Sequence, residues 1–138
     1  MKKVSIFGAT GSVGNNASKL ILDNITQYRV MVLSANKNYK KLAYNARKLN
    51  AKYAVIKEKK YYKLFKKELE GTSIKCLCGE DELESLATLK TDYTIASIVG
   101  IAGLKSAYNS IGNTKNLALA NKEALVCAGK IFMNKAKK

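Results

Sequence analysis

Three glycines near the start of the chain have the spacing of a phosphate-binding turn. The apolar run 4–7 predicts a strand, Gly8, Gly11 and Gly14 follow it, and a segment with helical apolar periodicity begins directly afterwards. In such a turn the first glycine lets the chain leave the strand sharply, and the second lets backbone approach a pyrophosphate. The third lets the helix pack close to the strand. Because a helix N-terminus also attracts phosphate, the motif predicts a dinucleotide site.

The residues after the second predicted strand indicate which dinucleotide binds. NAD-binding domains usually carry Asp or Glu there, about 20 residues beyond the glycines, to hold the ribose 2′-hydroxyl. In this chain the segment contains no carboxylate and reads Asn36-Lys37-Asn38 at its centre. Lys37 can attract a 2′-phosphate, and Asn38 can donate a hydrogen bond to it. We therefore predict NADPH rather than NADH as the cofactor.

A third group of chemistry-bearing residues lies where the last predicted strand meets the last helix. Asn121, Lys122 and Glu123 follow the apolar run 116–120. In a parallel sheet this is the edge at which ligands bind. Taken alone, the three residues are equally well explained as a helix cap with neighbouring surface charges.

The elements that position these residues alternate between strands and helices. The predicted strands are 4–7, 29–33, 53–56, 74–78, 93–99 and 116–120, of which 29–33 and 116–120 are expected to be buried. The pattern predicts an α/β fold, a Rossmann-type doubly wound parallel sheet in three α/β/α layers, built from six βα units. The expected strand order is 3-2-1-4-5-6. In the first helix, Val13, Ala17, Leu20 and Ile21 share one face, which we expect to pack on the sheet.

Composition narrows the class of protein. The 138 residues predict a single domain, and no apolar run reaches the roughly 20 residues of a membrane span. The first predicted strand starts so early that no leader peptide is expected ahead of it, which favours a cytosolic protein without a membrane partner. The formal net charge of +15 suggests nucleic acid, but the lysines alternate with apolar residues at core spacing, which argues against it. Cys76, Cys78 and Cys127 form no predicted metal site, because the chain has no His.

Four segments, taken together, resemble one enzyme family in order and spacing. They are Gly8-Ala-Thr-Gly-Ser-Val-Gly14, Ser34-Ala-Asn-Lys-Asn38, Ile98-Val-Gly-Ile-Ala-Gly-Leu104 and Leu117-Ala-Leu-Ala-Asn-Lys-Glu-Ala-Leu-Val-Cys-Ala-Gly129. Nearly the whole chain is similar to the amino-terminal domain of 1-deoxy-D-xylulose 5-phosphate reductoisomerases. The Leu-Ala-Asn-Lys-Glu run is the most specific of the four segments.

The resemblance implies an activity and a set of site residues. Enzymes of this family rearrange 1-deoxy-D-xylulose 5-phosphate, a sugar phosphate, and reduce the intermediate with NADPH to 2-C-methyl-D-erythritol 4-phosphate in non-mevalonate isoprenoid biosynthesis. Lys122 matches a substrate contact, and Asn36 stands where the family often has Gly. The implied cofactor contacts are Thr10, Gly11, Ser12, Val13, Asn36, Lys37, Asn38, Asn121 and Glu123.

The family's further parts are expected outside these residues. Its Mg²⁺ or Mn²⁺ ligands, its catalytic domain and its C-terminal domain all follow the Asn-Lys-Glu helix. Residues 1–138 are therefore expected to be the NADP(H)-binding Rossmann domain of a longer enzyme that is a homodimer, and to contain no catalytic or metal-binding residue. Two alternatives remain open: another NADP-dependent reductase resembling aspartate-semialdehyde dehydrogenase, and a non-catalytic dinucleotide- or nucleic-acid-binding module.

Overall fold

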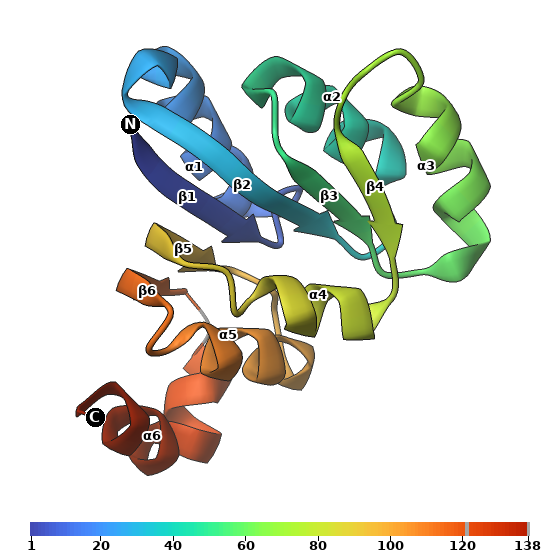
Figure 1. Cartoon of the computed structure of the whole chain (residues 1–138). Coiled ribbons are helices and arrows are strands. Elements are labelled where there is room, and N and C mark those ends of the chain that lie inside the picture. Colours follow the sequence, from blue (N-terminus) through green and yellow to red (C-terminus); the bar gives the residue numbers. More distant parts are fainter. Residues whose placement is uncertain (121, 138) are drawn as a thin grey trace.

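The structure, a computed structural model, describes residues 1–120 and 122–137, without the side chains of residues 122–125, 127 and 128. Strands and helices alternate along the whole described chain (Figure 1). The strands are β1 (Lys2–Phe7), β2 (Tyr28–Ala35), β3 (Tyr53–Ile56), β4 (Lys75–Cys78), β5 (Thr91–Ala96) and β6 (Thr114–Leu119). The α-helices are α1 (Ser12–Asp23), α2 (Tyr39–Leu49), α3 (Tyr62–Glu68), α4 (Glu80–Leu86), α5 (Leu104–Ser110) and α6 (Lys122–Lys137). Short 3-10 turns occupy Ile25–Gln27, Lys59–Tyr61 and Ile101–Gly103.

The six strands form one parallel sheet in the order β4-β3-β2-β1-β5-β6. This confirms the Rossmann-type doubly wound fold, but the expected order 3-2-1-4-5-6 is wrong for the fourth strand. β4 pairs with β3 at the outer edge, with Ala54 opposite Cys76, instead of lying beside β1. The chain reverses direction only after β4, and β5 then pairs with β1. The point at which the sheet divides therefore lies between β1 and β5.

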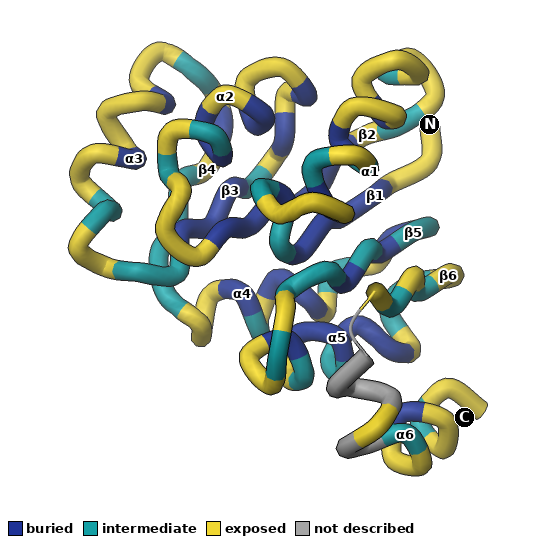
Figure 2. Tube along the Cα trace, turned by 180° about the vertical axis from the view of Figure 1, so that it is seen from behind, coloured by how far each residue is buried: buried dark blue, intermediate teal, exposed yellow. Residues whose placement is uncertain are grey.

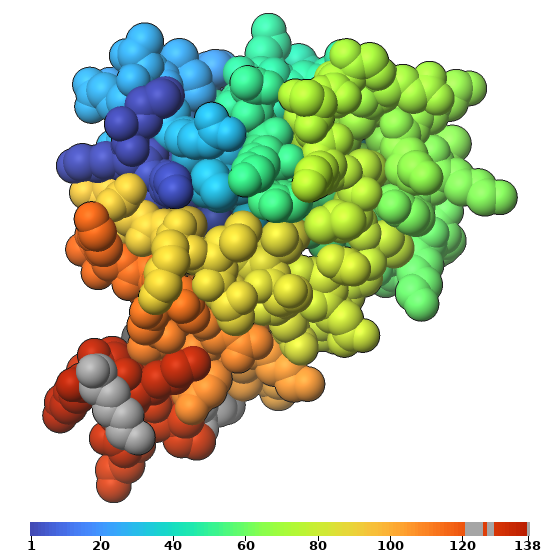
Figure 3. All heavy atoms as spheres, viewed as in Figure 1, coloured from blue at the N-terminus to red at the C-terminus, as the bar shows by residue number. Residues whose placement is uncertain are grey.

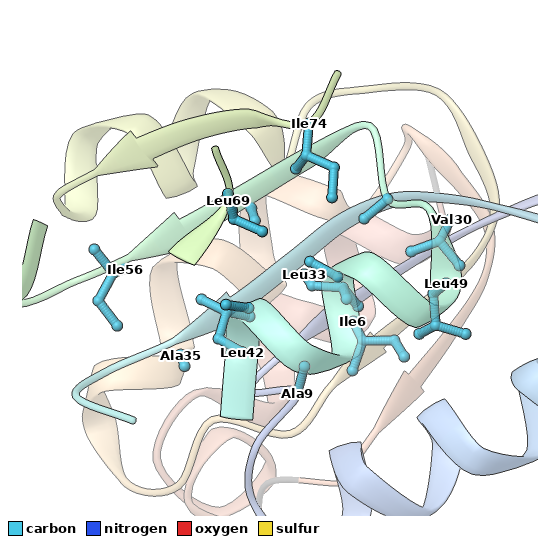
Figure 4. Packing of buried hydrophobic residues seen from close by; sticks show 14 of the residues in the cluster. Ile6, Ala9, Val30, Leu33, Ala35, Leu42, Leu49, Ile56, Leu69 and Ile74 are labelled. Carbon is cyan, nitrogen blue, oxygen red and sulfur yellow. The ribbon is translucent and has the colours of Figure 1, made fainter. Parts of the chain in front are cut away.

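The two faces of the sheet are covered by different helices. In Figure 1, α1, α2 and α3 lie on the upper side of the sheet and α4 and α5 on the lower side. The upper side holds the larger core, in which Leu33 and Ile6 of the sheet pack against Leu42 and Leu49 of α2 (Figure 4). On the lower side, α4 packs on Phe7 and other strand residues. Burying side chains on both faces explains why the central strands are almost continuously apolar.

The expected core face of α1 is partly wrong. Gly14, Ser18 and Ile21 are the buried residues of this helix, whereas Val13 is 50% exposed and Leu20 is 66% exposed. Gly14 lies so close to the preceding turn that a Cβ on it would be 2.0 Å from the Gly8 carbonyl oxygen. Facing Gly14 toward the turn rotates α1, and this rotation carries Val13 and Leu20 away from the sheet.

The last strand and helix are less covered than the sequence predicts. β6 is an edge strand, and its residues are exposed or half-buried, so the prediction of a buried strand is wrong there (Figure 2). α6 projects from the body of the molecule beside α5 (Figure 3). The Phe132 ring of α6 meets the Tyr108 ring of α5 edge-on at 5.8 Å. The Lys135 ammonium donates to the Tyr108 carbonyl oxygen at 2.7 Å.

Candidate functional site

The glycine turn connects β1 to α1 at the carboxyl edge of the sheet. Gly8 has a φ of +85°, and a Cβ on it would lie 2.9 Å from the carbonyl carbon of Ser97 in the neighbouring strand connection. A Cβ on Gly14 would lie 2.0 Å from the Gly8 carbonyl oxygen. Both positions therefore exclude a side chain, which confirms the sharp turn at Gly8 and the close helix approach at Gly14.

Gly11 differs from the other two glycines because it faces open space. A Cβ there would have only the Gly8 carbonyl oxygen nearby, at 3.8 Å. Gly11 is the N-cap residue of α1, with φ −76° and ψ 178°. The N–H groups of Ser12 and Val13 start the helix and have no partner within it, as in every α-helix. The free N–H groups at this end of α1 can therefore donate hydrogen bonds to the oxygens of a phosphate.

Hydrogen bonds from both neighbouring strands hold the turn in place. On the β2 side, the Gly8 N–H donates to the Ser34 hydroxyl at 3.0 Å, and the Ala9 N–H donates to the Ser34 carbonyl at 2.7 Å. On the β5 side, the Ser97 hydroxyl lies 2.8 and 3.0 Å from the carbonyl oxygens of Phe7 and Gly8. Ser34 and Ser97 were not predicted from the sequence as residues that hold the turn. Their signal is a hydroxyl residue at the carboxyl end of a strand beside the glycine turn.

The turn opens into a cavity of about 220 Å³ at the point where the sheet divides. Its wall is contributed by the ends of β1, β2 and β5, the first residue after β3 and the start of α4. The lining residues are Gly8, Thr10, Gly11, Ser34, Ala35, Asn36, Lys57, Glu80, Leu83, Ser97, Ile98, Val99 and Ala102. A cavity at this edge and at this division of the sheet is the usual ligand site of a doubly wound fold.

The predicted cofactor residues that the structure describes gather on this edge. Thr10, Gly11 and Asn36 line the cavity. Ser12 and Val13 are the exposed first residues of α1 beside it.

Lys37 and Asn38 follow in the turn between β2 and α2. Both are exposed, and neither lines the cavity itself. The Asn38 side-chain oxygen accepts a hydrogen bond from the Lys41 N–H at 3.2 Å and so caps α2. The cap uses only the side-chain oxygen, so the Asn38 side-chain NH2 group can still donate to a ligand.

The Asn-Lys-Glu group is only partly within the described structure. Asn121 lies outside the described residues, and so do the side chains of Lys122 and Glu123. The backbone shows where the group begins, because Ala120, the first residue after β6, donates its N–H to the carbonyl oxygen of Ala96 at the end of β5, at 3.0 Å. α6 therefore starts on the same edge of the sheet as the cavity.

Lys57 and Glu80 line the cavity but were not predicted from the sequence. Lys57 is the first residue after β3, and Glu80 is the first residue of α4. Their signal is position alone: a charged residue one or two positions after a predicted parallel strand lies at the ligand edge. Lys57 is half-buried and Glu80 is exposed.

Metal ligands and membrane-spanning helices are the next features to consider in the described residues. Among residues 1–120 and the described part of α6, no group of three or more His, Cys, Asp and Glu side chains is placed to hold a metal ion. No described helix combines the length and the apolarity needed to cross a bilayer.

Cys76 and Cys78 are free and half-buried, and burial raises the pKa of Cys76 to about 11.

Comparison with known proteins identifies relatives along nearly the whole chain. The family model for 1-deoxy-D-xylulose 5-phosphate reductoisomerase matches residues 4–129. The reductoisomerase of Wolbachia pipientis from Culex pipiens is 46% identical over 138 residues, which are 99% of this chain and 35% of that protein. The reductoisomerase of Zymomonas mobilis is 42% identical over 133 residues, which are 96% of this chain and 34% of that protein.

Solved structures of reductoisomerases are also similar to nearly the whole chain. The Zymomonas mobilis reductoisomerase in complex with NADPH superposes with a TM-score of 0.96 at 41% identity, over 99% of this chain and 36% of that one. A DOX-P reductoisomerase in complex with NADPH, fosmidomycin and magnesium gives 0.91 at 30% identity, over 99% and 34%. The chain thus spans about a third of the length of these relatives. It belongs to the 1-deoxy-D-xylulose 5-phosphate reductoisomerase family.

Proposed function

We propose that residues 1–138 are the NADP(H)-binding domain of a 1-deoxy-D-xylulose 5-phosphate reductoisomerase. The whole protein would convert 1-deoxy-D-xylulose 5-phosphate to 2-C-methyl-D-erythritol 4-phosphate at the expense of NADPH. The observation that carries the proposal is the glycine turn, which opens into the cavity between β1 and β5 and has Asn36 and Lys37 beside it. Family membership and the NADPH complexes of two relatives support it.

The residues on this edge fit the cofactor. The pyrophosphate would lie over Gly11, where a side chain is missing and the first N–H groups of α1 point outward. The 2′-phosphate would lie near Lys37 and the amide group of Asn38. With no carboxylate in the turn from Asn36 to Asn38, no charge there repels the phosphate.

The roles proposed for Asn121, Lys122 and Glu123 follow from the resemblance of the Asn-Lys-Glu run to the family. When bound, NADPH supplies the hydride for the reduction. Asn121 and Glu123 would contact the nicotinamide half, and Lys122 would hold a negatively charged oxygen of the sugar phosphate. The described residues offer no ligand set for the Mg²⁺ or Mn²⁺ of the family, so no step through a metal is assigned to this chain. A homodimeric, cytosolic whole enzyme remains a prediction from the sequence.

The test compares cofactor affinities by isothermal titration calorimetry with the 138-residue chain. Lys37→Ala should weaken NADPH binding about tenfold, because it removes one charge-assisted contact, and should leave NADH binding nearly unchanged. Lys48→Ala, in the last turn of α2, is the matched control, because it removes an exposed lysine from the other end of the helix. Equal weakening of NADPH and NADH by Lys37→Ala would contradict the proposed 2′-phosphate contact.

A second measurement concerns catalysis. We expect the isolated chain to bind NADPH without oxidising it when 1-deoxy-D-xylulose 5-phosphate and Mg²⁺ are added. Absorbance at the NADPH band reports the reaction directly. Metal-dependent oxidation by this chain would show that the metal ligands lie within it, contrary to the proposal.

A further inference from the structure

We propose that Lys57 is a second cation for the 2′-phosphate of NADPH and determines, with Lys37, the preference for NADPH over NADH. The inference rests on the proposed function, because it concerns the same cofactor. The residue lies after β3, on a different element from the glycine turn and from the Asn36–Asn38 segment. Sequence motifs for dinucleotide binding extend to the end of the second strand and do not include it.

Backbone hydrogen bonds fix Lys57 beside the ribose-binding segment. The Lys57 N–H donates to the Ala35 carbonyl oxygen at 2.9 Å, and the Glu58 N–H donates to the Asn36 carbonyl oxygen at 3.1 Å. These bonds continue the β2–β3 pairing, in which Ala35 lies opposite Ile56, past the end of the sheet. Lys57 is therefore held next to Asn36, and both residues line the same cavity.

The charge of Lys57 is available to a ligand. Within the described part of the chain, ion pairs join Lys105 to Glu84 and Lys115 to Asp92, and neither includes Lys57. Neighbouring lysines behave differently, since the Lys60 ammonium lies 5.1 Å from the centre of the Tyr61 ring. A half-buried cation that lines a cavity and has no protein partner there favours an anion.

The position of Glu80 narrows where that anion binds. Glu80 lines the same cavity from the start of α4 and carries the opposite charge. A phosphate group near this carboxylate would be repelled, whereas one between Asn36, Lys37 and Lys57 would be attracted. The adenosine end of the cofactor is the part that carries such a group next to the end of β2. The arrangement therefore assigns Lys57 to the 2′-phosphate.

Lys37 and Lys57 together would attract the 2′-phosphate more strongly than Lys37 alone. Lys37 is exposed, so salt and water screen its attraction for phosphate. Lys57 is half-buried and lines the cavity, where a bound phosphate would displace water and be screened less. The 2′-phosphate carries a charge of about −1.5 to −2 at neutral pH, so it can pair with two cations at once.

The experiment titrates the 138-residue chain with NADPH and with NADH in a calorimeter. Lys57→Gln should weaken NADPH binding about tenfold and leave NADH binding within about twofold, and Lys57→Arg should retain most of the NADPH affinity. Lys59→Gln is the matched control, because Lys59 is an exposed lysine two residues away that does not line the cavity. Circular dichroism checks that each variant is folded.

The outcomes separate this inference from the function on which it rests. Unchanged NADPH affinity in Lys57→Gln, or an equal loss for both dinucleotides, overturns the role of Lys57 and leaves the NADPH site standing. A loss of the same size in Lys59→Gln shows that only the general positive field matters, and also overturns it. Wild-type protein that binds no NADPH overturns the proposed function and this inference together.

Discussion

Gly14→Ala should destabilise the protein through a single added methyl group. The new Cβ would lie 2.0 Å from the Gly8 carbonyl oxygen and 2.8 Å from both the Gly8 carbonyl carbon and the Ala9 Cα. Non-bonded heavy atoms attract at about 3.5 Å or more, so α1 and the turn would have to separate by more than about 1 Å. All three atoms belong to backbone, and no side chain can rotate away.

The magnitude follows from two opposing effects. Overpacking a close contact costs about 1–3 kcal/mol, and the upper end applies where backbone must move. Alanine regains up to about 1 kcal/mol through its higher helix propensity. We expect a net loss of about 2 kcal/mol in the free energy of unfolding, or about 8 °C in Tm for a chain of this size. NADPH affinity should fall too, because the displaced turn no longer aligns its N–H groups.

Gly11→Ala is the control that separates stability from binding. Its Cβ would meet only one atom, at 3.8 Å, and its backbone angles suit alanine. Alanine is a poorer N-cap than glycine but restricts the unfolded chain more, and because these two effects oppose each other the unfolding free energy should change by less than about 0.5 kcal/mol. The methyl group projects toward the proposed pyrophosphate, so NADPH binding should weaken by at least about tenfold. Urea unfolding and calorimetry measure the two quantities. Gly14→Ala as stable as wild type, or Gly11→Ala equally destabilised, would refute the reasoning.

Two further predictions concern pH. The Lys3 N–H donates to the Asp92 carboxylate at 2.7 Å, and the Lys115 ammonium lies 3.0 Å from its other oxygen, so the pKa of Asp92 is lowered. This stabilisation is present above the usual carboxyl pKa of about 3.9 and is lost as pH falls through the lower folded value. Asp92→Asn should therefore destabilise the protein at pH 7 but much less at pH 3 in urea unfolding, and equal effects at both pH values would contradict this. Burial raises the pKa of Cys76 to about 11, which lowers the thiolate fraction at pH 8 about a hundredfold relative to the unfolded chain. The more basic thiolate is about tenfold more nucleophilic, so iodoacetamide should alkylate Cys76 about tenfold more slowly in the folded than in the urea-unfolded chain. Mass spectrometry of the Cys76 peptide measures both rates, and equal rates would show that burial does not suppress the thiolate.

The strand order shows what apolar patterning leaves open. Patterning predicts that strands and helices alternate, but the direction of each crossover depends on which face of the sheet the helix covers. Phe65 and Leu69, from α3 and the residue after it, pack in the core that α1 and α2 cover, so a right-handed crossover adds β4 outside β3. Leu83 and Leu86 of α4 pack on the opposite face, and the next strand is therefore placed beyond β1. Both helices have an apolar stripe, and nothing in the stripe says which face it meets.

The parts of the site that could be predicted from the sequence are those where the backbone conformation or a close backbone contact allows only one residue type. Gly8 and Gly14 could be recognised because no other residue fits their positions. Lys57 could not, because a lysine after a strand is common on any surface, and only the neighbouring backbone bonds place this one at the cavity. The exposed Leu20 illustrates the reverse case. Its helical spacing suggests core, but the close approach at Gly14 fixes the rotation of the whole helix.

The serine hydrogen bonds around the glycine turn have a consequence for the energetics and speed of binding. Ser34 and Ser97 hold the turn from β2 and from the segment after β5, so its conformation is set by the protein alone. A pre-organised turn loses little conformational entropy when a ligand arrives. Association should then be governed by diffusion and by the attraction between a cationic protein and an anionic dinucleotide. The rate constant should accordingly fall as ionic strength rises, and no slow phase of loop ordering should precede the bound state.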